Sequence, residues 1–370
     1  MPRTELCERF GLEAPVFAFT IHPEVAAAVS RAGGLGVLGA LRFTAEELEE
    51  ALTYIEGEVG GRPYGVDVVM PASSQQVDAT EVSDLTSSLE AMIPDGHKQF
   101  VEEVLQRHEV PSVPDDVPEA RGVLGWTDLT ARAQLDVIFS GNYQPALIAN
   151  ALGPPPEDVV ARAHEHDMAV AALVGTVEHA RAQRDVGVDV IVAVGTEAGG
   201  HTGEVSTMVL VPEVVDAVDP LPVLAAGGIG RGRQAAAAVA LGAQGAWTGS
   251  MWLTTSEYEM APVLRNKLLE ASHRDTVRSR SMTGKPARQL RTGWTDVWDA
   301  PDTPAPLKMP LQWLLTADAQ QRMQHWQPPD LIGTPVGQIV GSMNEVRPVK
   351  EVVDEMVSEY DATIKRLTTG

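Results

Sequence analysis

Short apolar segments recur along the chain and alternate with segments of helical periodicity. Several of them are apolar on both faces, which is typical of parallel strands that are covered by helices. In order, the segments are residues 14–20, 35–40, 64–70, 146–152, 169–174, 189–195, 221–228 and 245–253. Eight strands that alternate with helices make an α/β protein, and the number eight favours a closed (β/α)8 TIM barrel over a doubly wound sheet.

The predicted helices carry start and stop signals. Thr44 and Glu47 form a capping-box pattern before a helix that reaches about residue 55. Pro156 suits the first turn of the next clear helix, and Thr176 can cap a helix that Gly187 ends. These signals support the alternation of strands with helices.

Two regions interrupt the alternation. Residues 71–144 are too long for one crossover, so we expect an insertion after the third strand, with a helix at 96–106. After residue 273 the strand pattern stops, and an amphipathic helix at 348–366 is expected to pack on the barrel exterior. We therefore expect a barrel domain of residues 1–272 and a mainly helical extension of residues 273–370.

Charge and composition exclude several classes of function. The chain has 51 acidic and 28 basic residues, a formal charge of −23 that disfavours nucleic acid as a partner. The single cysteine, Cys7, excludes an intramolecular disulfide and a thiolate metal cluster, and we expect no metal site. No apolar stretch is long enough to be a signal peptide or a membrane span. We therefore expect a cytoplasmic protein without a membrane partner.

Two glycine-rich segments follow the seventh and eighth predicted strands. They read AAGGIGRGRQ at 225–234 and GAWTGS at 245–250. Glycines at strand ends let backbone N–H groups approach a ligand, and the loops after strands seven and eight are the habitual phosphate site of these barrels. The pattern predicts a phosphate site, although the same glycines could only make tight turns.

A third segment, VGTEAGGHTGE at 194–204, follows the sixth strand. The glycine pair before His201 leaves this side chain free to project over a flat ligand, and histidine transfers protons near neutral pH. His22 follows the first strand at the same mouth and is a candidate substrate contact.

These segments together resemble the nitronate monooxygenase family, formerly called nitropropane dioxygenases. The resemblance rests on HPEVAAAVSRAGGLGVLGA, RPYGVDV, GTEAGGHTG, PVLAAGGIGRGRQ, GAQGAWTGS and, more loosely, MTGKPARQLRTGW. It implies noncovalent FMN, a small-molecule substrate and O2, with His201 as the catalytic base or substrate-binding residue. It also implies cofactor contacts, with the phosphate at Gly227, Gly228, Gly249 and Ser250, and the flavin near Gly199, Gly200, Trp247 and Thr248.

Three positions depart from the family pattern. Val194 stands where glutamine is usual, and Asp67 stands where asparagine is usual. The first strand reads APVFAF, so Phe17 is expected to line the pocket. A carboxylate at Asp67 would disfavour the anionic reduced flavin unless it is protonated or turned away.

The resemblance leaves the reaction open. The first hypothesis is oxidation of alkyl nitronates by O2 to a carbonyl compound and nitrite. The alternative is an NAD(P)H-dependent reductase of enoyl thioesters or quinones on the same scaffold, because a fold does not fix a function. A non-catalytic flavin sensor and a phosphate-binding aldolase are further hypotheses. The sequence also allows a homo-oligomer.

Overall fold

The computed structural model describes residues 4–70, 79–117 and 128–369. Eight parallel strands close into a barrel in the order β1-β2-β3-β4-β5-β6-β8-β9. The strands are β1 (Val16–Thr20), β2 (Leu35–Gly39), β3 (Tyr64–Asp67), β4 (Leu147–Asn150), β5 (Ala169–Val174), β6 (Val190–Val194), β8 (Val223–Ala226) and β9 (Gly245–Thr248). Each lies inside one of the eight expected segments, so the TIM barrel is confirmed.

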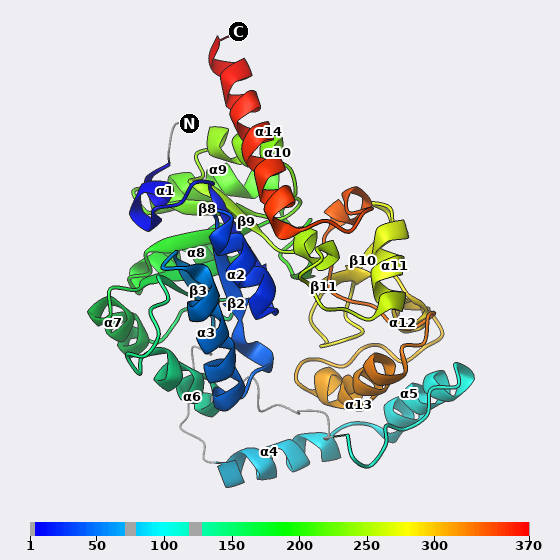
Figure 1. The fold of residues 1–370 in the computed structure, drawn as a ribbon. Coiled ribbons are helices and arrows are strands. Elements are labelled where there is room, and N and C mark those ends of the chain that lie inside the picture. Colours follow the sequence, from blue (N-terminus) through cyan, green and yellow to red (C-terminus); the bar gives the residue numbers. More distant parts are fainter. Residues whose placement is uncertain (1–3, 71–78, 118–127, 370) are drawn as a thin grey trace.

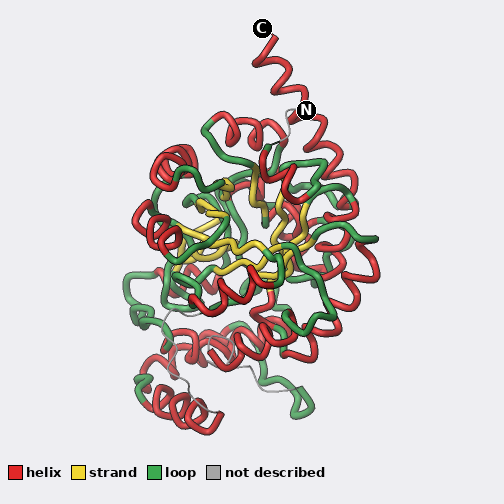
Figure 2. The backbone as a smooth tube through the Cα atoms, turned by 90° about the vertical axis from the view of Figure 1, so that its left-hand side faces the viewer, coloured by secondary structure: helices red, strands yellow, loops and turns green. Residues whose placement is uncertain are grey.

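Helices surround the strands, as Figure 2 shows. The helices that follow successive strands are α2 (Pro23–Arg31), α3 (Ala45–Val59), α6 (Asp128–Ile138), α7 (Glu157–Glu165), α8 (Val177–Asp185), α9 (Thr207–Val218) and α10 (Gly232–Ala240). The capping box is confirmed, since Thr44 accepts a hydrogen bond from the amide of Glu47 at 3.1 Å and Glu47 caps Thr44 in return. Thr176 likewise caps α8.

The barrel interior is filled with small and branched apolar side chains. Leu35, Val37, Ala149 and Val192 are fully buried members of this interior cluster. Helix α1 (Glu5–Phe10) adds Leu6 and Phe10 to the same cluster beside the amino ends of the strands. The barrel interior is thus a packed core and not a pore, and in TIM barrels the active site sits at the carboxyl rim.

The expected insertion contains α4 (Ala79–Ala91) and α5 (Asp95–Arg107) before α6. Residues 71–78 and 118–127 of this insertion lie outside the described residues. Helix α5 packs beside α12 (Gly293–Asp299) and α13 (Leu311–Trp326), with Val104, Trp298 and Leu315 in one cluster. We call this group of helices the lobe; in Figure 1 α12 and α13 lie to the right of the barrel helices.

The expectation that strands end near residue 273 is wrong. β10 (Thr276–Ser279) and β11 (Ala287–Leu290) form an antiparallel hairpin, and β7 (Gly200–His201) pairs with β11. Each strand of the hairpin has four residues that include Arg, Ser, Thr or Gln, so neither produces an apolar segment. These residues therefore become strands through pairing with the segment after β6 and not through a local apolar pattern.

The last part of the chain returns to the barrel. It contains the 3-10 turn η3 (Ser250–Thr254), α11 (Pro262–Glu270), the 3-10 turn η4 (Gln338–Ser342) and α14 (Val349–Thr369). A further 3-10 turn, η1 (Ala40–Arg42), follows β2. Helix α14 lies against α10 and α2, and its end projects past the body in Figure 1. None of the described helices has the length and apolar character needed to cross a bilayer.

Contact between α14 and α10 depends on a glycine. A Cβ atom at Gly232 would lie 2.0 Å from the carbonyl oxygen of Met356 and 2.5 Å from the amide nitrogen of Tyr360. Backbone atoms cannot yield as a flexible side chain can, so any larger residue must move the two helices apart.

The Gly232→Ala variant should lose about 1–3 kcal/mol of unfolding free energy, because overpacking separates α10 from α14. The matched control is Gly57→Ala in α3, where no atom lies within 4 Å of the added Cβ. That control should gain up to about 1 kcal/mol from helix propensity. Urea denaturation of both variants measures the difference, and equal stability of the two would contradict the packing described.

Candidate functional site

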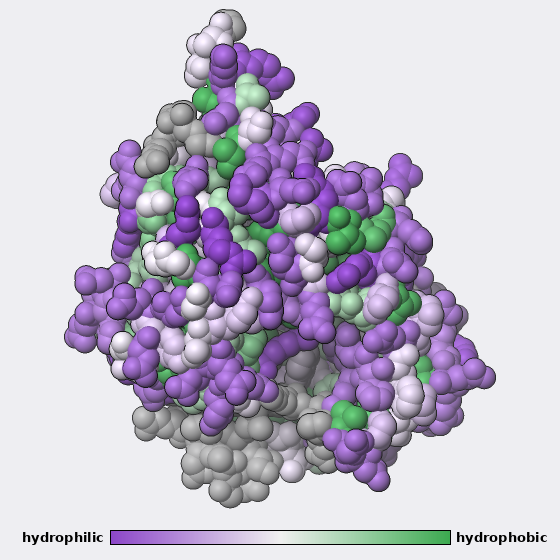
Figure 3. All heavy atoms as spheres, in the orientation of Figure 1, coloured by the Kyte–Doolittle hydropathy of each residue, from purple (hydrophilic) through white to green (hydrophobic). Residues whose placement is uncertain are grey.

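The carboxyl ends of β6, β8 and β9 bring three loops together at one rim of the barrel. In the strand register Val194 pairs with Ala226, and Ala226 pairs with Trp247. The segments that follow these strands contain the predicted His201, Gly228 and Gly249, so the three segments start from neighbouring positions. In the view of Figure 3 the surface is hollowed between the barrel, on the left, and the lobe.

The loop after β8 is fixed by side chains on both sides. Gly227 and Gly228 have φ values of +104° and +68°, which favour glycine. The Thr207 hydroxyl donates to the Gly227 carbonyl at 2.9 Å. The Gln234 amide donates to the Gly228 carbonyl at 2.6 Å and accepts from the Gly230 N–H at 2.9 Å. This loop is therefore rigid before any ligand arrives.

Several backbone donors remain unused at this rim. Within the part of the chain that the structure describes, the N–H groups of Gly228, Ile229 and Gly249 donate to no protein acceptor. A Cβ atom at Gly249 would meet no atom closer than 4.0 Å, so the space beside it is open. Unpaired N–H groups that line an open space are the donor set that a phosphate requires.

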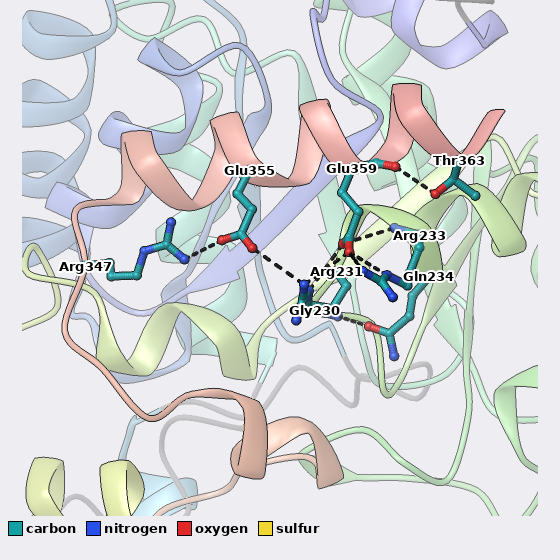
Figure 4. Close-up of polar contacts among 8 residues, drawn as sticks. All are labelled: Gly230, Arg231, Arg233, Gln234, Arg347, Glu355, Glu359 and Thr363. Carbon is teal, nitrogen blue, oxygen red and sulfur yellow. Dashed lines mark hydrogen bonds and ion pairs between the residues drawn. The ribbon is translucent and has the colours of Figure 1, made fainter. Parts of the chain in front are cut away.

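Protein carboxylates occupy the two nearest helix N-termini. Glu197 accepts from the Thr207 amide at 2.9 Å at the start of α9. Glu359 on α14 accepts from the Arg233 amide at 3.3 Å at the start of α10 and from the guanidinium groups of Arg231 and Arg233 (Figure 4). Burial raises the pKa of Glu359, but these hydrogen bonds outweigh burial, so the pKa is lowered. At this rim the loop amides, and not the helix ends, are therefore left without a carboxylate acceptor.

His201 lies on β7, opposite Ala287 of the hairpin. Its Nδ1 is 3.2 Å from the Pro286 carbonyl oxygen, which can only accept, so Nδ1 carries the proton of the neutral ring. Its Nε2 is 3.4 Å from the hydroxyl oxygen of Thr283. The residue is exposed, yet burial of the ring lowers its pKa, and Lys285 lowers it further against the Pro286 hydrogen bond.

The turn that holds His201 is itself anchored by the lobe. Thr316 on α13 donates to the Met282 carbonyl at 2.8 Å, and Gln312 donates to the Ser281 carbonyl at 3.0 Å. Thr316 and Gln312 are fully buried. The orientation of the His201 ring thus depends on a helix more than one hundred residues away in sequence.

Residues 336–338 join the loops after β6 and β9. The Gly337 N–H donates to the Ser250 hydroxyl at 2.7 Å, and the Gln338 N–H donates to the Glu197 carbonyl at 2.9 Å. A Cβ at Gly199 would lie 2.9 Å from the Gly337 nitrogen, so Gly199 contacts this segment. Gly200, with φ +78°, has no atom within 4 Å of such a Cβ and adjoins open space.

Three predicted residues lie on or inside the strands. Phe17 packs edge-to-face on Phe10 with ring centroids 5.9 Å apart, deep in the barrel, whereas Phe19 is two residues nearer the rim. Trp247 belongs to the interior cluster. Thr248 instead donates to the Phe17 carbonyl at 3.1 Å and accepts from the Trp252 indole at 3.1 Å, so its hydroxyl is already used by the protein.

Asp67 and His22 lie at the ends of β3 and β1. Asp67 is the last residue of β3, and burial raises its pKa to about 7. His22 is the residue that precedes α2, just after β1, and its ring centroid is 4.1 Å from that of Tyr258. Burial lowers the pKa of His22.

Sequence reasoning missed the residues that support the site. Thr207, Gln234, Thr283, Pro286 and Gly337 hold the loops, but each is an ordinary residue type without a local signal. The MTGKPARQL motif was the one available indication, since it contains both Thr283 and Pro286.

A cavity at the other end of the barrel is a poorer candidate. It has a volume of about 210 Å³ and is lined by Arg9, Phe10, Pro63, Ala146, Asp167 and Ala169, at the amino ends of the strands. In TIM barrels this end serves stability, whereas catalytic groups gather at the carboxyl rim.

Comparisons with known proteins identify the relatives of this chain. The chain is 52% identical to Rv1533 of Mycobacterium tuberculosis, whose name describes a monooxygenase, over 99% of this chain and 98% of that protein. It is 27% identical to a Staphylococcus aureus protein named as a nitronate monooxygenase, over 82% of this chain and 83% of that protein.

Two solved structures resemble the whole chain. Nitroalkane oxidase from Streptomyces ansochromogenes has a TM-score of 0.79 and 27% identity, and covers 98% of this chain and 99% of its own. FabK from Thermotoga maritima has a TM-score of 0.74 and 26% identity, and covers 100% of this chain and 99% of its own.

The family match extends over nearly all of the sequence. The nitronate monooxygenase family model matches residues 3–359, which include the barrel, the insertion and most of α14. The chain is therefore an oxidoreductase that belongs to the nitronate monooxygenase family.

Proposed function

We propose that this enzyme is an FMN-dependent nitronate monooxygenase, which oxidises alkyl nitronates with O2 to a carbonyl compound and nitrite. The observation that carries the proposal is the set of unpaired amides in the loops after β8 and β9, strands that lie beside β6, after which His201 follows. Its substrates are a small organic molecule and O2. In this proposal residues 1–272 hold the cofactor and residues 273–370 orient His201 and cover the site.

The rim fits the phosphate of FMN. The amides of Gly228, Ile229 and Gly249 are unpaired in the described residues, and the space beside Gly249 is open. Gly227 gives the loop its left-handed turn, and Ser250 fixes the opposite side through Gly337. A phosphate held by backbone donors needs no lysine, which agrees with the acidic charge of the chain.

The flavin ring would lie on the carboxyl end of the barrel. Phe19, Leu173 and Val194 are partly buried residues that pack on the interior cluster, and they offer an apolar floor beside Trp247. Bound FMN would supply the redox chemistry, accepting electrons from the substrate and passing them to O2. Asp67 lies beside this floor, because its register neighbour Gly39 has the Phe19 ring against it.

His201 is suited to act as a base. Because Nδ1 donates to Pro286, the neutral ring presents Nε2 as its basic nitrogen. The lowered pKa keeps this ring neutral at pH 7, so Nε2 can take a proton from the α-carbon of a neutral nitroalkane. Nearby His22, paired with Tyr258, is proposed as a substrate contact at the same mouth.

Replacement of His201 by asparagine should reduce nitrite release from neutral 2-nitropropane by about 100-fold or more, as expected for loss of a general base. Release from the preformed nitronate should fall far less, because that substrate has already lost its proton. For wild type, kcat/KM with the nitroalkane should rise with pH through the lowered pKa of His201 and then level off. Equal losses with both substrates would contradict the assigned role.

Replacement of Gly249 by aspartate should abolish copurification of FMN, since a carboxylate would enter the space proposed for the phosphate. Gly249→Ala should weaken FMN binding to a smaller degree. The ratio of flavin absorbance near 450 nm to protein absorbance measures occupancy, with Gly57→Ala as the control. Full FMN occupancy in Gly249→Asp would place the phosphate elsewhere.

The similarity to FabK favours a second candidate, an NAD(P)H-dependent flavin reductase that acts on enoyl thioesters or quinones. The two functions differ in what reduces the flavin. Anaerobic mixing with NADH or NADPH should leave the flavin band of a nitronate monooxygenase unbleached, while a nitronate should bleach it. Bleaching by either nucleotide within seconds would favour the reductase.

A further inference from the structure

The carboxyl group of Asp67 is directed into the barrel. Along β3, residues 64 and 66 belong to the outer cluster that faces the helices, so residues 65 and 67 face the interior. A Cβ at Gly65 would meet side-chain atoms of Leu147 and Val37, two interior residues. Asp67 is the last residue of its strand, so its side chain lies at the rim end of the interior.

The surroundings of this carboxyl group are apolar. Its neighbours in the register are Gly39 on β2 and Ala149 on β4, and the Phe19 ring lies against Gly39. Asp67 is 5% exposed, and among the described residues it is the one acidic side chain buried to this degree. No hydrogen bond or ion pair from the described residues reaches its carboxyl group.

A buried carboxyl group without a partner is costly when ionised. Burial accordingly raises the pKa of Asp67 to about 7, so that a large share of the group is neutral at neutral pH. A neutral carboxyl group differs from a carboxylate because it has an O–H to donate. The edge of a flavin ring presents carbonyl oxygens and ring nitrogens that accept hydrogen bonds, and the ring gains negative charge when it is reduced.

We infer that Asp67 stays protonated beside the bound flavin and donates a hydrogen bond to its edge, so that FMN binding requires this proton. This inference rests on the proposed FMN site. Two features carry the inference: the interior position at the rim, and the absence of a described protein partner. Cofactor affinity then falls as the carboxyl group ionises.

Other titratable groups face the same mouth. They are His201 on β7 with Lys285 beside it, and His22 after β1 with Tyr258, Glu24, Glu259 and Arg42 around it. The strands on either side of Asp67 contribute only Gly39 and Ala149 at this level. Burial lowers the pKa of both histidines, whereas burial raises the pKa of Asp67.

The test measures FMN dissociation constants at pH 6 and pH 8 by quenching of flavin fluorescence on binding to apoprotein. Because Asp67 titrates near pH 7, the dissociation constant of wild type for FMN should rise about tenfold from pH 6 to pH 8. Asp67→Asn keeps a donor that does not ionise, so its constant should change less than twofold. Asp67→Leu has no donor and should bind FMN weakly at both pH values.

A pH dependence that persists in Asp67→Asn, or its absence in wild type, overturns the inference while leaving the FMN site intact. Failure of wild type to bind FMN at either pH overturns the proposed cofactor as well. His201→Asn is the control for the other titratable group, and it should keep the tenfold rise.

A second readout needs no cofactor. The folded pKa of Asp67 lies above its unfolded value, so apoprotein stability from this group is lost as pH rises from about 4 to 7. Asp67→Asn should therefore raise the apoprotein Tm at pH 8 more than at pH 5. An equal or smaller effect at pH 8 would show that the carboxyl group is not held as a neutral acid.

Discussion

Closure of the eight parallel strands is the constraint on which the other features depend. Parallel strands place all their carboxyl ends at one edge, where β6, β8 and β9 are direct neighbours, and closure brings β1 beside β9. Loops separated by dozens of residues in sequence consequently share one rim, where they can surround a single ligand. The packed interior prevents the barrel itself from acting as a pore, and the carboxyl rim is where TIM barrels place their active sites.

The C-terminal part of the chain converts this rim into a defined site. The hairpin β10–β11 takes the segment after β6 as a third strand and orients His201, while α13 fixes the turn of the hairpin. Residues 336–338 tie the loops after β6 and β9, and α14 fixes the start of α10. The candidate site of this chain therefore depends on residues from nearly its whole length.

Much of the fold could be predicted because the barrel strands are local apolar segments with clear helix caps between them. The hairpin could not, since Thr276–Ser279 and Ala287–Leu290 have no apolar periodicity and become strands through pairing with Gly200–His201. The glycine loops and His201 carried recognisable signals. Phe17 is buried against Phe10 and the Thr248 hydroxyl bonds within the protein, so their contacts with a flavin stay predictions.

We propose that one rim of the barrel binds FMN through the loops after β8 and β9, with His201 above the ring. A crystal structure of the protein grown with FMN tests this proposal most directly. We expect phosphate oxygens within hydrogen-bond distance of the Gly228 and Gly249 amides and the ring between His201 and Asp67. Phosphate at the amino ends of the strands, or His201 turned away from the ring, would contradict it.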